Sequence, residues 1–136
     1  MLNKPKKRTY PTHHNIIKPS VYKWKTVTLK TQFALISCEN GILTAAQISA
    51  AVLSIKRSIK QNIKLITHVF PHLPVTKRPL EMPLGKGKSN ISHWVTPIKA
   101  GSIIFELNTD QVILSKTALK AASYKLPIKT QIIRKA

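Results

Sequence analysis

The segment Thr44 to Ile59, T-A-A-Q-I-S-A-A-V-L-S-I-K-R-S-I, carries the clearest signal for the fold. Thr44 and Gln47 have the spacing of a capping box, in which the threonine hydroxyl caps the third helical N–H and the glutamine reaches back. Apolar residues then recur at helical spacing on one face, with basic residues largely off it. The apolar positions are Ile48, Ala51, Val52, Ile55 and Ile59, and the basic ones are Lys56, Arg57 and Lys60. The segment therefore predicts an amphipathic helix that ends near Asn62.

Upstream of this helix, Val27 to Ser37 alternates apolar and polar positions, which predicts a strand. Its apolar face would carry Val27, Leu29, Thr31, Phe33 and Leu35. Glu39-Asn40-Gly41 predicts a turn between the strand and the helix. Downstream of the helix, Lys64 to Phe70 predicts a second strand, which Pro71 and Pro74 stop.

The second half of the chain predicts a hairpin, a helix and a closing strand. Ser92 to Ile98 and Ser102 to Leu107 would pair around Ala100-Gly101, with Trp94 packed against a helix. Asp110 would cap a second helix that reaches about Tyr124 and ends at Pro127. Its inward residues would be Ile113, Leu114, Ala118, Ala121 and Ala122, and Ile128 to Ile133 would form a last extended segment. The order β-α-β-β-α-β with mainly antiparallel pairing predicts an α+β fold.

The 136 residues suit one domain, residues 27–136, preceded by a basic arm, residues 1–26. Pro5, Pro11 and Pro19 prevent a continuous helix in the arm. Cys38 is the single cysteine, so an intrachain disulfide is excluded. No apolar run approaches the roughly 18 residues that a membrane span requires.

The charge of the chain is its strongest functional signal. Lys and Arg together number 23, against 4 Asp and Glu, which gives a net charge of +19. Such an excess indicates a polyanionic partner, and nucleic acid is the first hypothesis. The candidates for phosphate contact are Lys4, Lys6, Lys7, Arg8, His13, His14, Lys18, Lys23 and Lys25 in the arm, Lys56, Arg57 and Lys60 on the first helix, Lys77 and Arg78 in the middle of the chain, and Lys125 and Lys129 near its end.

A basic glycine loop, Gly85-Lys86-Gly87-Lys88, follows the proline-rich middle of the chain. With Ser89 it resembles the tail of a phosphate-binding P-loop, but Met82 stands where that motif needs its first glycine. A P-loop also links a strand to a helix, whereas a strand is predicted after this loop. The loop is therefore interpreted as a flexible basic segment that can enter a narrow RNA crevice.

The remaining polar residues predict neither catalysis nor metal binding. Four carboxylates are too few for paired-carboxylate chemistry, and no serine, histidine and acid set is recognisable. His13 and His14 are adjacent and have no carboxylate nearby to orient them as metal ligands. We predict no catalytic residue, no metal, no cofactor and no small-molecule substrate.

Several blocks resemble, in order, those of the bacterial-type large-subunit ribosomal protein L sixteen family. Gly41 to Ile48 is similar to that family's G-x-L-T-x-x-Q-I helix start, and Lys64 to Pro71 to its K-I-W-I-R-V-F-P strand. The further matching blocks are Pro74 to Leu80, Gly85 to Lys88, Trp94-Val95, Phe105-Glu106 and Leu126 to Gln131. The opening Pro5 to Thr9 resembles the family's P-K-R-T arm.

This resemblance implies two helices packed on an antiparallel sheet, of the alpha/beta-hammerhead type. It also implies a structural role in the large ribosomal subunit, with large-subunit rRNA and neighbouring ribosomal proteins as partners. In that family the glycine–lysine loop points toward the aminoacyl-tRNA path near the peptidyl transferase region. Gly85, Lys86, Gly87 and Lys88 are therefore expected to be proximal to tRNA.

The chain departs from the family pattern around the loop and on one strand. Pro83 and Leu84 replace an arginine and a methionine, Ser89 replaces a glycine, and Ile66 and His68 replace a tryptophan and an arginine. These losses, the lysine-rich composition and a start that coincides with the family's own indicate translation inside an organelle, namely a mitochondrion. A plastid or bacterial ribosome and a free-standing RNA-binding protein are the alternatives.

Overall fold

The capping box predicted at Thr44 is present and begins helix α1 (Ala45–Ser58). In the computed structural model, Gln47 N donates to Thr44 Oγ1 over 3.3 Å, and Thr44 N donates to Gln47 Oε1 over 2.9 Å. Ile48, Ala51 and Ile55 form the buried face of the helix, as predicted. The helix ends at Ser58, before the predicted end at Asn62, which lies outside the described residues.

The structure describes Pro5, residues 29–59, 63–81, Gly85, Gly87 and residues 89–109 and 111–135. Besides α1, its elements are β1 (Phe33–Ser37), β2 (Gly41–Thr44), β3 (Lys64–Thr67), β4 (Leu73–Thr76), β5 (Ile91–Ile98), β6 (Ile103–Asn108), α2 (Val112–Ser123) and β7 (Thr130–Arg134). The strands form two antiparallel sheets, with the orders β3-β6-β1-β7 and β2-β5-β4. The predicted α+β class, two helices packed with antiparallel sheet, is confirmed.

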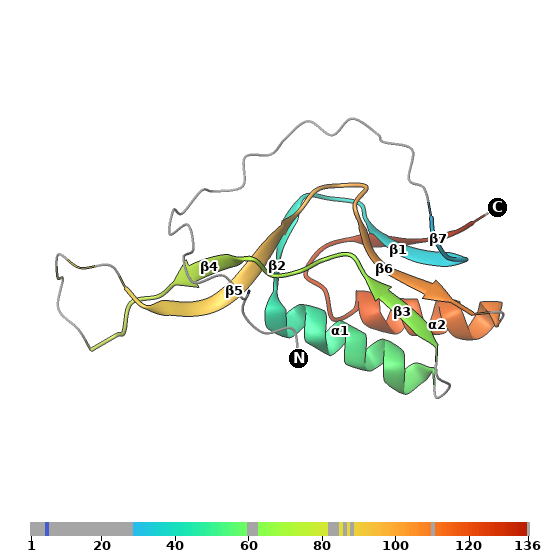
Figure 1. Cartoon of the computed structure of the whole chain (residues 1–136), viewed down its shortest axis with the longest axis horizontal. Helices are drawn as coiled ribbons and strands as arrows, with labels where there is room; N and C mark the ends of the chain where they lie inside the picture. The colour runs from blue at the N-terminus through green and yellow to red at the C-terminus, as the bar shows by residue number, and fades with distance from the viewer. Residues whose placement is uncertain are drawn as a thin grey trace.

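The core lies between the two helices, which pack side by side, and the strands of both sheets (Figure 1). α2 contacts β1 and β7 of the larger sheet, and α1 contacts β2 and β5 of the smaller one. The largest fully buried apolar side chains of the core are Phe33, Leu35, Leu43, Ile48, Ile55, Ile104, Phe105, Leu107 and Leu119. Strand β1 lies between β6 and β7, and all five of its residues are buried. This strand begins at Phe33 rather than at the predicted Val27, which is not among the described residues, although Leu29 and Thr31 are buried as expected.

The predicted hairpin of β5 and β6 is wrong, because the two strands belong to different sheets. β5 pairs with β2 and β4, whereas β6 pairs with β1 and β3. The turn between them docks onto the end of β1: Gly101 N donates to Ser37 O over 2.6 Å, and Ser37 N donates to Ser102 O over 3.0 Å. The sequence pattern of Gly41 to Thr44 is that of a turn and a helix start, so it does not reveal β2 as the partner of β5.

Pro74 also lies inside a strand, β4, rather than stopping one. β4 is an edge strand of the smaller sheet, where a residue without an N–H is tolerated. Strand β3 correspondingly ends at Thr67 and not at Phe70. The chain between β3 and β4 crosses from the larger sheet to the smaller one.

Helix α2 differs from its prediction at its start and on its buried face. Its N-cap is Gln111, which makes no side-chain capping bond, and the predicted cap Asp110 lies outside the described residues. The buried positions are Ser115, Ala118, Leu119 and Ala122, which follow helical spacing. Ile113, predicted to face inward, is 83% exposed because it is two residues out of phase with that face.

Strands β4 and β5 extend beyond the helices as a two-stranded ribbon (Figure 1). The first three residues of β5 are exposed, and burial begins near Val95, where the ribbon meets the body. Trp94, expected to pack against a helix, is half-buried at this boundary. Gly85 and Gly87 thus lie on the connection between β4 and β5, beyond the paired part of the ribbon.

Candidate nucleic-acid interface

The exposed charged residues of the described segments are almost all cationic. Of its three carboxylates, Glu106 is buried, Glu39 is half-buried, and Glu81 is exposed. The exposed Lys and Arg residues are Lys30, Lys56, Arg57, Lys64, Lys77, Lys99, Lys116, Lys120, Lys125, Lys129, Arg134 and Lys135. A surface of this kind attracts a phosphate backbone from many directions.

The predicted phosphate-contact residues fall into two groups. Lys56, Arg57, Lys77, Lys125 and Lys129 are exposed, and Arg78 is half-buried. The others lie outside the described residues: Lys4, Lys6, Lys7, Arg8, His13, His14, Lys18, Lys23, Lys25 and Lys60. Lys86 and Lys88 of the tRNA-proximal loop also lie outside them. The structure therefore gives the surface positions of the described residues, and every phosphate contact stays a prediction.

Strands β4 and β5 stay paired up to the connection that contains Gly85 and Gly87. β4 and β5 pair up to Thr76 opposite Ile91, and Lys77 N donates to Asn90 O over 3.4 Å. Gly85 and Gly87 are exposed beyond this closure. A Cβ atom added at Gly87 would meet no atom within 4 Å, so packing within the protein does not require glycine there.

The two helices bring together two predicted cations that are distant in sequence. Arg57, in the last turn of α1, and Lys125, just after α2, line one open groove of about 450 Å³. The rest of its lining comes from α1, namely Ala50, Leu53, Ser54 and Ser58. The exposed Leu53 and the serine hydroxyls were not singled out from the sequence, because periodicity marks the buried face of a helix and not the surface that adjoins it.

Lys129 is fixed through its backbone. Lys129 N donates to Glu39 Oε1 over 2.8 Å, and its carbonyl oxygen accepts from Cys38 N over 2.8 Å. These bonds hold the segment before β7 against the turn that follows β1. The Lys129 side chain stays exposed at a defined place on the surface.

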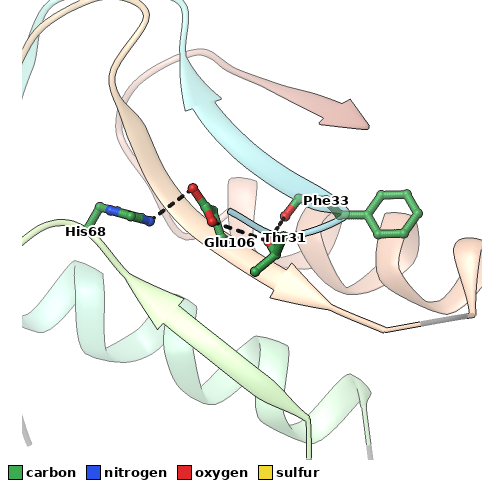
Figure 2. Close-up of polar contacts among 4 residues, drawn as sticks. All are labelled: Thr31, Phe33, His68 and Glu106. Atoms are coloured by element: carbon green, nitrogen blue, oxygen red, sulfur yellow. Dashed lines mark hydrogen bonds and ion pairs between the residues drawn. The ribbon is translucent and has the colours of Figure 1, made fainter. Parts of the chain in front are cut away.

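Glu106 is the centre of a buried polar cluster that joins three segments (Figure 2). Its Oε1 lies 3.1 Å from His68 Nε2, an ion-pair distance, without the alignment of a hydrogen bond. The Thr31 hydroxyl lies 3.4 Å from Glu106 Oε2 and 3.3 Å from the Phe33 carbonyl oxygen, so its one proton serves two acceptors. The His68 side chain is 28% exposed and points to Glu106, so it holds β3 to β6 instead of standing free for RNA.

Other kinds of site find little support in the described segments. No three His, Cys, Asp or Glu side chains gather there in a way that could hold a metal ion. His93, for example, is exposed and contacts only its neighbour Ser92 through Nδ1. None of the described helices has the length and apolar character needed to cross a membrane.

Comparison with known proteins gives consistent matches along most of the chain. The sequence profile of the family described as Ribosomal protein L16p/L10e matches residues 5–133. The large ribosomal subunit protein uL16 of Phytoplasma australiense is 36% identical over 135 residues, which cover 96% of this chain and 95% of that protein. The protein of the same name from Thioalkalivibrio sulfidiphilus is 43% identical over 102 residues, with 75% and 74% covered. The one from Acholeplasma laidlawii is 34% identical over 131 residues, with 96% and 95% covered.

Proposed function

Because the chain belongs to the ribosomal protein L16p/L10e family, we propose that it binds large-subunit rRNA as a structural constituent of the large ribosomal subunit. Members of this family are structural and non-enzymatic components of the ribosome. The observation that carries the proposal is the near absence of exposed acid beside many exposed cations in the described residues. RNA phosphate neutralises such a surface, and phosphate contacts mainly position a protein on its nucleic acid.

The proposal assigns different parts of the chain to different contacts. Residues 1–26 act as an rRNA-binding arm, and residues 27–136 form the domain that docks on the subunit. Lys77 and Arg78, at the base of the glycine loop, contact rRNA, while Gly85, Lys86, Gly87 and Lys88 reach toward aminoacyl-tRNA near the peptidyl transferase region. The projecting ribbon supports this last assignment, because β4 and β5, which flank the loop in sequence, extend away from the helices. Neighbouring ribosomal proteins are the remaining partners.

A mitochondrial ribosome is the proposed location. Support comes from a lysine-rich, arginine-poor composition and from the replacement of family arginines near Pro83 and at His68. A bacterial ribosome is the second candidate, and the bacterial origin of the relatives named above favours it. A plastid ribosome and a free-standing RNA-binding protein are further alternatives.

Sedimentation with a high-salt wash tests the proposal. The tagged protein is expected to remain in the large-subunit fraction at one copy per particle after the wash. Release into light fractions would indicate a peripheral factor or a free RNA binder. Carried out on separated mitochondria, plastids and cytosol, the same experiment distinguishes a mitochondrial ribosome from a plastid one.

A further inference from the structure

We propose that the groove lined by Arg57 and Lys125 is a composite binding site for one continuous stretch of RNA phosphodiester backbone. Neither helix provides this site alone, because α1 supplies one cation and the segment after α2 supplies the other. The inference rests on the proposed function and refines it, since it names the surface that holds the RNA and the chemistry that does so.

The periodicity of α1 explains how the groove arises. Its lining residues on this helix are Ala50, Leu53, Ser54, Arg57 and Ser58, which recur at intervals of three and four and so share one side of the helix. This side adjoins the buried stripe of Ile48, Ala51 and Ile55. Because α2 packs beside α1, the residues that follow α2 come alongside, and Lys125 completes the lining.

The two positive charges of the groove favour binding of an anion. Neither Arg57 nor Lys125 forms an ion pair with any described residue. Two described carboxylates are engaged elsewhere: Glu39 accepts from Lys129 N, and Glu106 faces His68 and Thr31. The third, Glu81, lies on the connection after β4. Two cations that share a groove without a counter-charge repel each other, and a bound phosphate relieves that repulsion.

The anion is held by side chains rather than by a helix end. Arg57 lies in the last turn of α1, where the helix dipole attracts cations and repels anions. Its planar guanidinium can bind phosphate in a bidentate way, and the Lys125 ammonium adds a compact point charge. The Ser54 hydroxyl makes no hydrogen bond to described residues and is available to a phosphate oxygen, whereas the Ser58 hydroxyl donates to Ser54 O over 2.9 Å.

The apolar part of the groove favours a nucleic-acid strand over a free anion. Leu53 is 51% exposed, and Ala50 lies one turn before it on the same side. This surface can cover the apolar face of a ribose or a base while the two cations contact the phosphates next to it. A single inorganic phosphate would leave Leu53 in water, so an extended ligand uses the whole lining.

Charge-neutral variants of the full-length chain test the proposal. Arg57→Gln, Lys125→Gln and the double variant are compared with Lys116→Gln/Lys120→Gln, which removes the same charge from exposed α2 positions outside the groove. The probe is large-subunit rRNA, and affinity is measured across a range of salt concentrations. Each groove variant should bind about five- to tenfold more weakly. Because both cations hold one RNA stretch, the double variant should lose less than the product of the two single losses.

Two further readouts sharpen the result. The log–log salt slope of the groove double variant should become shallower by about 1.4 to 1.8, or roughly 0.7 to 0.9 per lost phosphate contact. In a hydroxyl-radical footprint, that variant should lose protection over one short continuous stretch of rRNA. Equal unfolding midpoints in urea for all variants would establish that the folded state is unchanged.

The outcomes separate this proposal from the one on which it rests. If the groove pair weakens binding no more than the control pair, or if protection is lost at two separate stretches, the composite site is wrong while the ribosomal role stands. If the groove double variant no longer joins the assembled subunit but keeps its affinity for naked rRNA, the groove binds an acidic protein segment instead. If the wild-type chain binds rRNA no better than random RNA and does not sediment with the subunit, the proposed function itself fails.

Discussion

Gly41 and Gly87 differ in the space around their Cα atoms, and this difference predicts opposite effects of the same substitution. A Cβ atom at Gly41 would overlap the Cγ2 methyl group of the buried Ile128, whereas at Gly87 it would meet nothing within 4 Å. Gly41→Ala should lower the free energy of unfolding by about 1 to 3 kcal/mol through overpacking. Gly87→Ala should change it by less than about 0.5 kcal/mol.

Urea unfolding of the two full-length variants checks this pair. An unchanged midpoint for Gly41→Ala would mean that Ile128 moves aside without cost. The comparison also bears on function. If a stable Gly87→Ala variant loses RNA or tRNA contact, the added methyl group hinders the approach of the nucleic acid. Packing against Ile128 thus accounts for the glycine at position 41. Packing within the protein does not account for the glycine at position 87, which leaves contact with a partner of the loop as its reason.

The contact of Glu106 with His68 gives a second prediction for single residues. Glu106 is fully buried, and the Thr31 hydroxyl satisfies it only in part. His68→Leu should therefore lower the free energy of unfolding by about 1 to 3 kcal/mol, the cost of leaving a buried polar group without its partner. His68→Arg should preserve stability, because a longer cation can still reach the carboxylate and the family strand carries arginine at this position.

His93→Leu is the matched control for this prediction, because His93 is exposed and, among the described residues, its side chain is hydrogen-bonded only to Ser92. Its midpoint in urea should lie close to that of the wild type. Equal stability of His68→Leu and the wild type would show that the carboxylate is solvated or protonated in the folded protein, and that the pair does not hold β3 to β6.

At the scale of elements, α1 depends on its capping box. Thr44 also ends β2, so the box joins the smaller sheet to the helix. Thr44→Ala should lower the free energy of unfolding by about 1 kcal/mol, because one N–H at the helix start loses its acceptor. Thr44→Ser keeps the hydroxyl and should retain most of that stability, as circular dichroism during urea unfolding would reveal. Equal losses in both variants would assign the role of Thr44 to β2 packing instead.

How far the elements could be predicted depended on whether their signals were local. The capping box, the buried face of α1 and the closing strand after Pro127 rest on residues close in sequence, and all were predicted. β2 runs directly into the capping box of α1, which masks it as a helix start, and β4 contains Pro74. Their existence depends on pairing with β5, which a local pattern does not contain. The same missing partner turned the β5–β6 sheet crossing into a predicted hairpin.

For the whole molecule, the sequence predicts which residues contact phosphate but not which of them lie together. Net charge predicted Arg57 and Lys125 as contacts separately, and only the packing of α2 on α1 puts them in one groove. The exposed Ile113 illustrates the same limit, since its place off the buried face of α2 follows from how the helix meets the core. It lines a second groove with Gln111, Val112, Leu114 and Thr117, whose lining carries no charge.

The helices and the larger sheet form the body of the protein, and β4 and β5 extend beyond the helices as a ribbon. This division leads to a prediction about the assembled ribosome. If the body holds the protein on rRNA and the loop reaches toward tRNA, Lys86→Ala/Lys88→Ala should impair tRNA accommodation more than subunit assembly. Pairing of β4 with β5 and the Lys77–Asn90 bond lie outside the substitution, so the ribbon should stay intact. Subunit yield by sedimentation and the rate of aminoacyl-tRNA binding to purified particles measure the two effects.

The control variant Lys116→Ala/Lys120→Ala removes equal charge from α2 and should leave both subunit yield and tRNA binding unchanged. If assembly fails first in the loop variant, the loop is a clamp on rRNA, and its approach to tRNA contributes little.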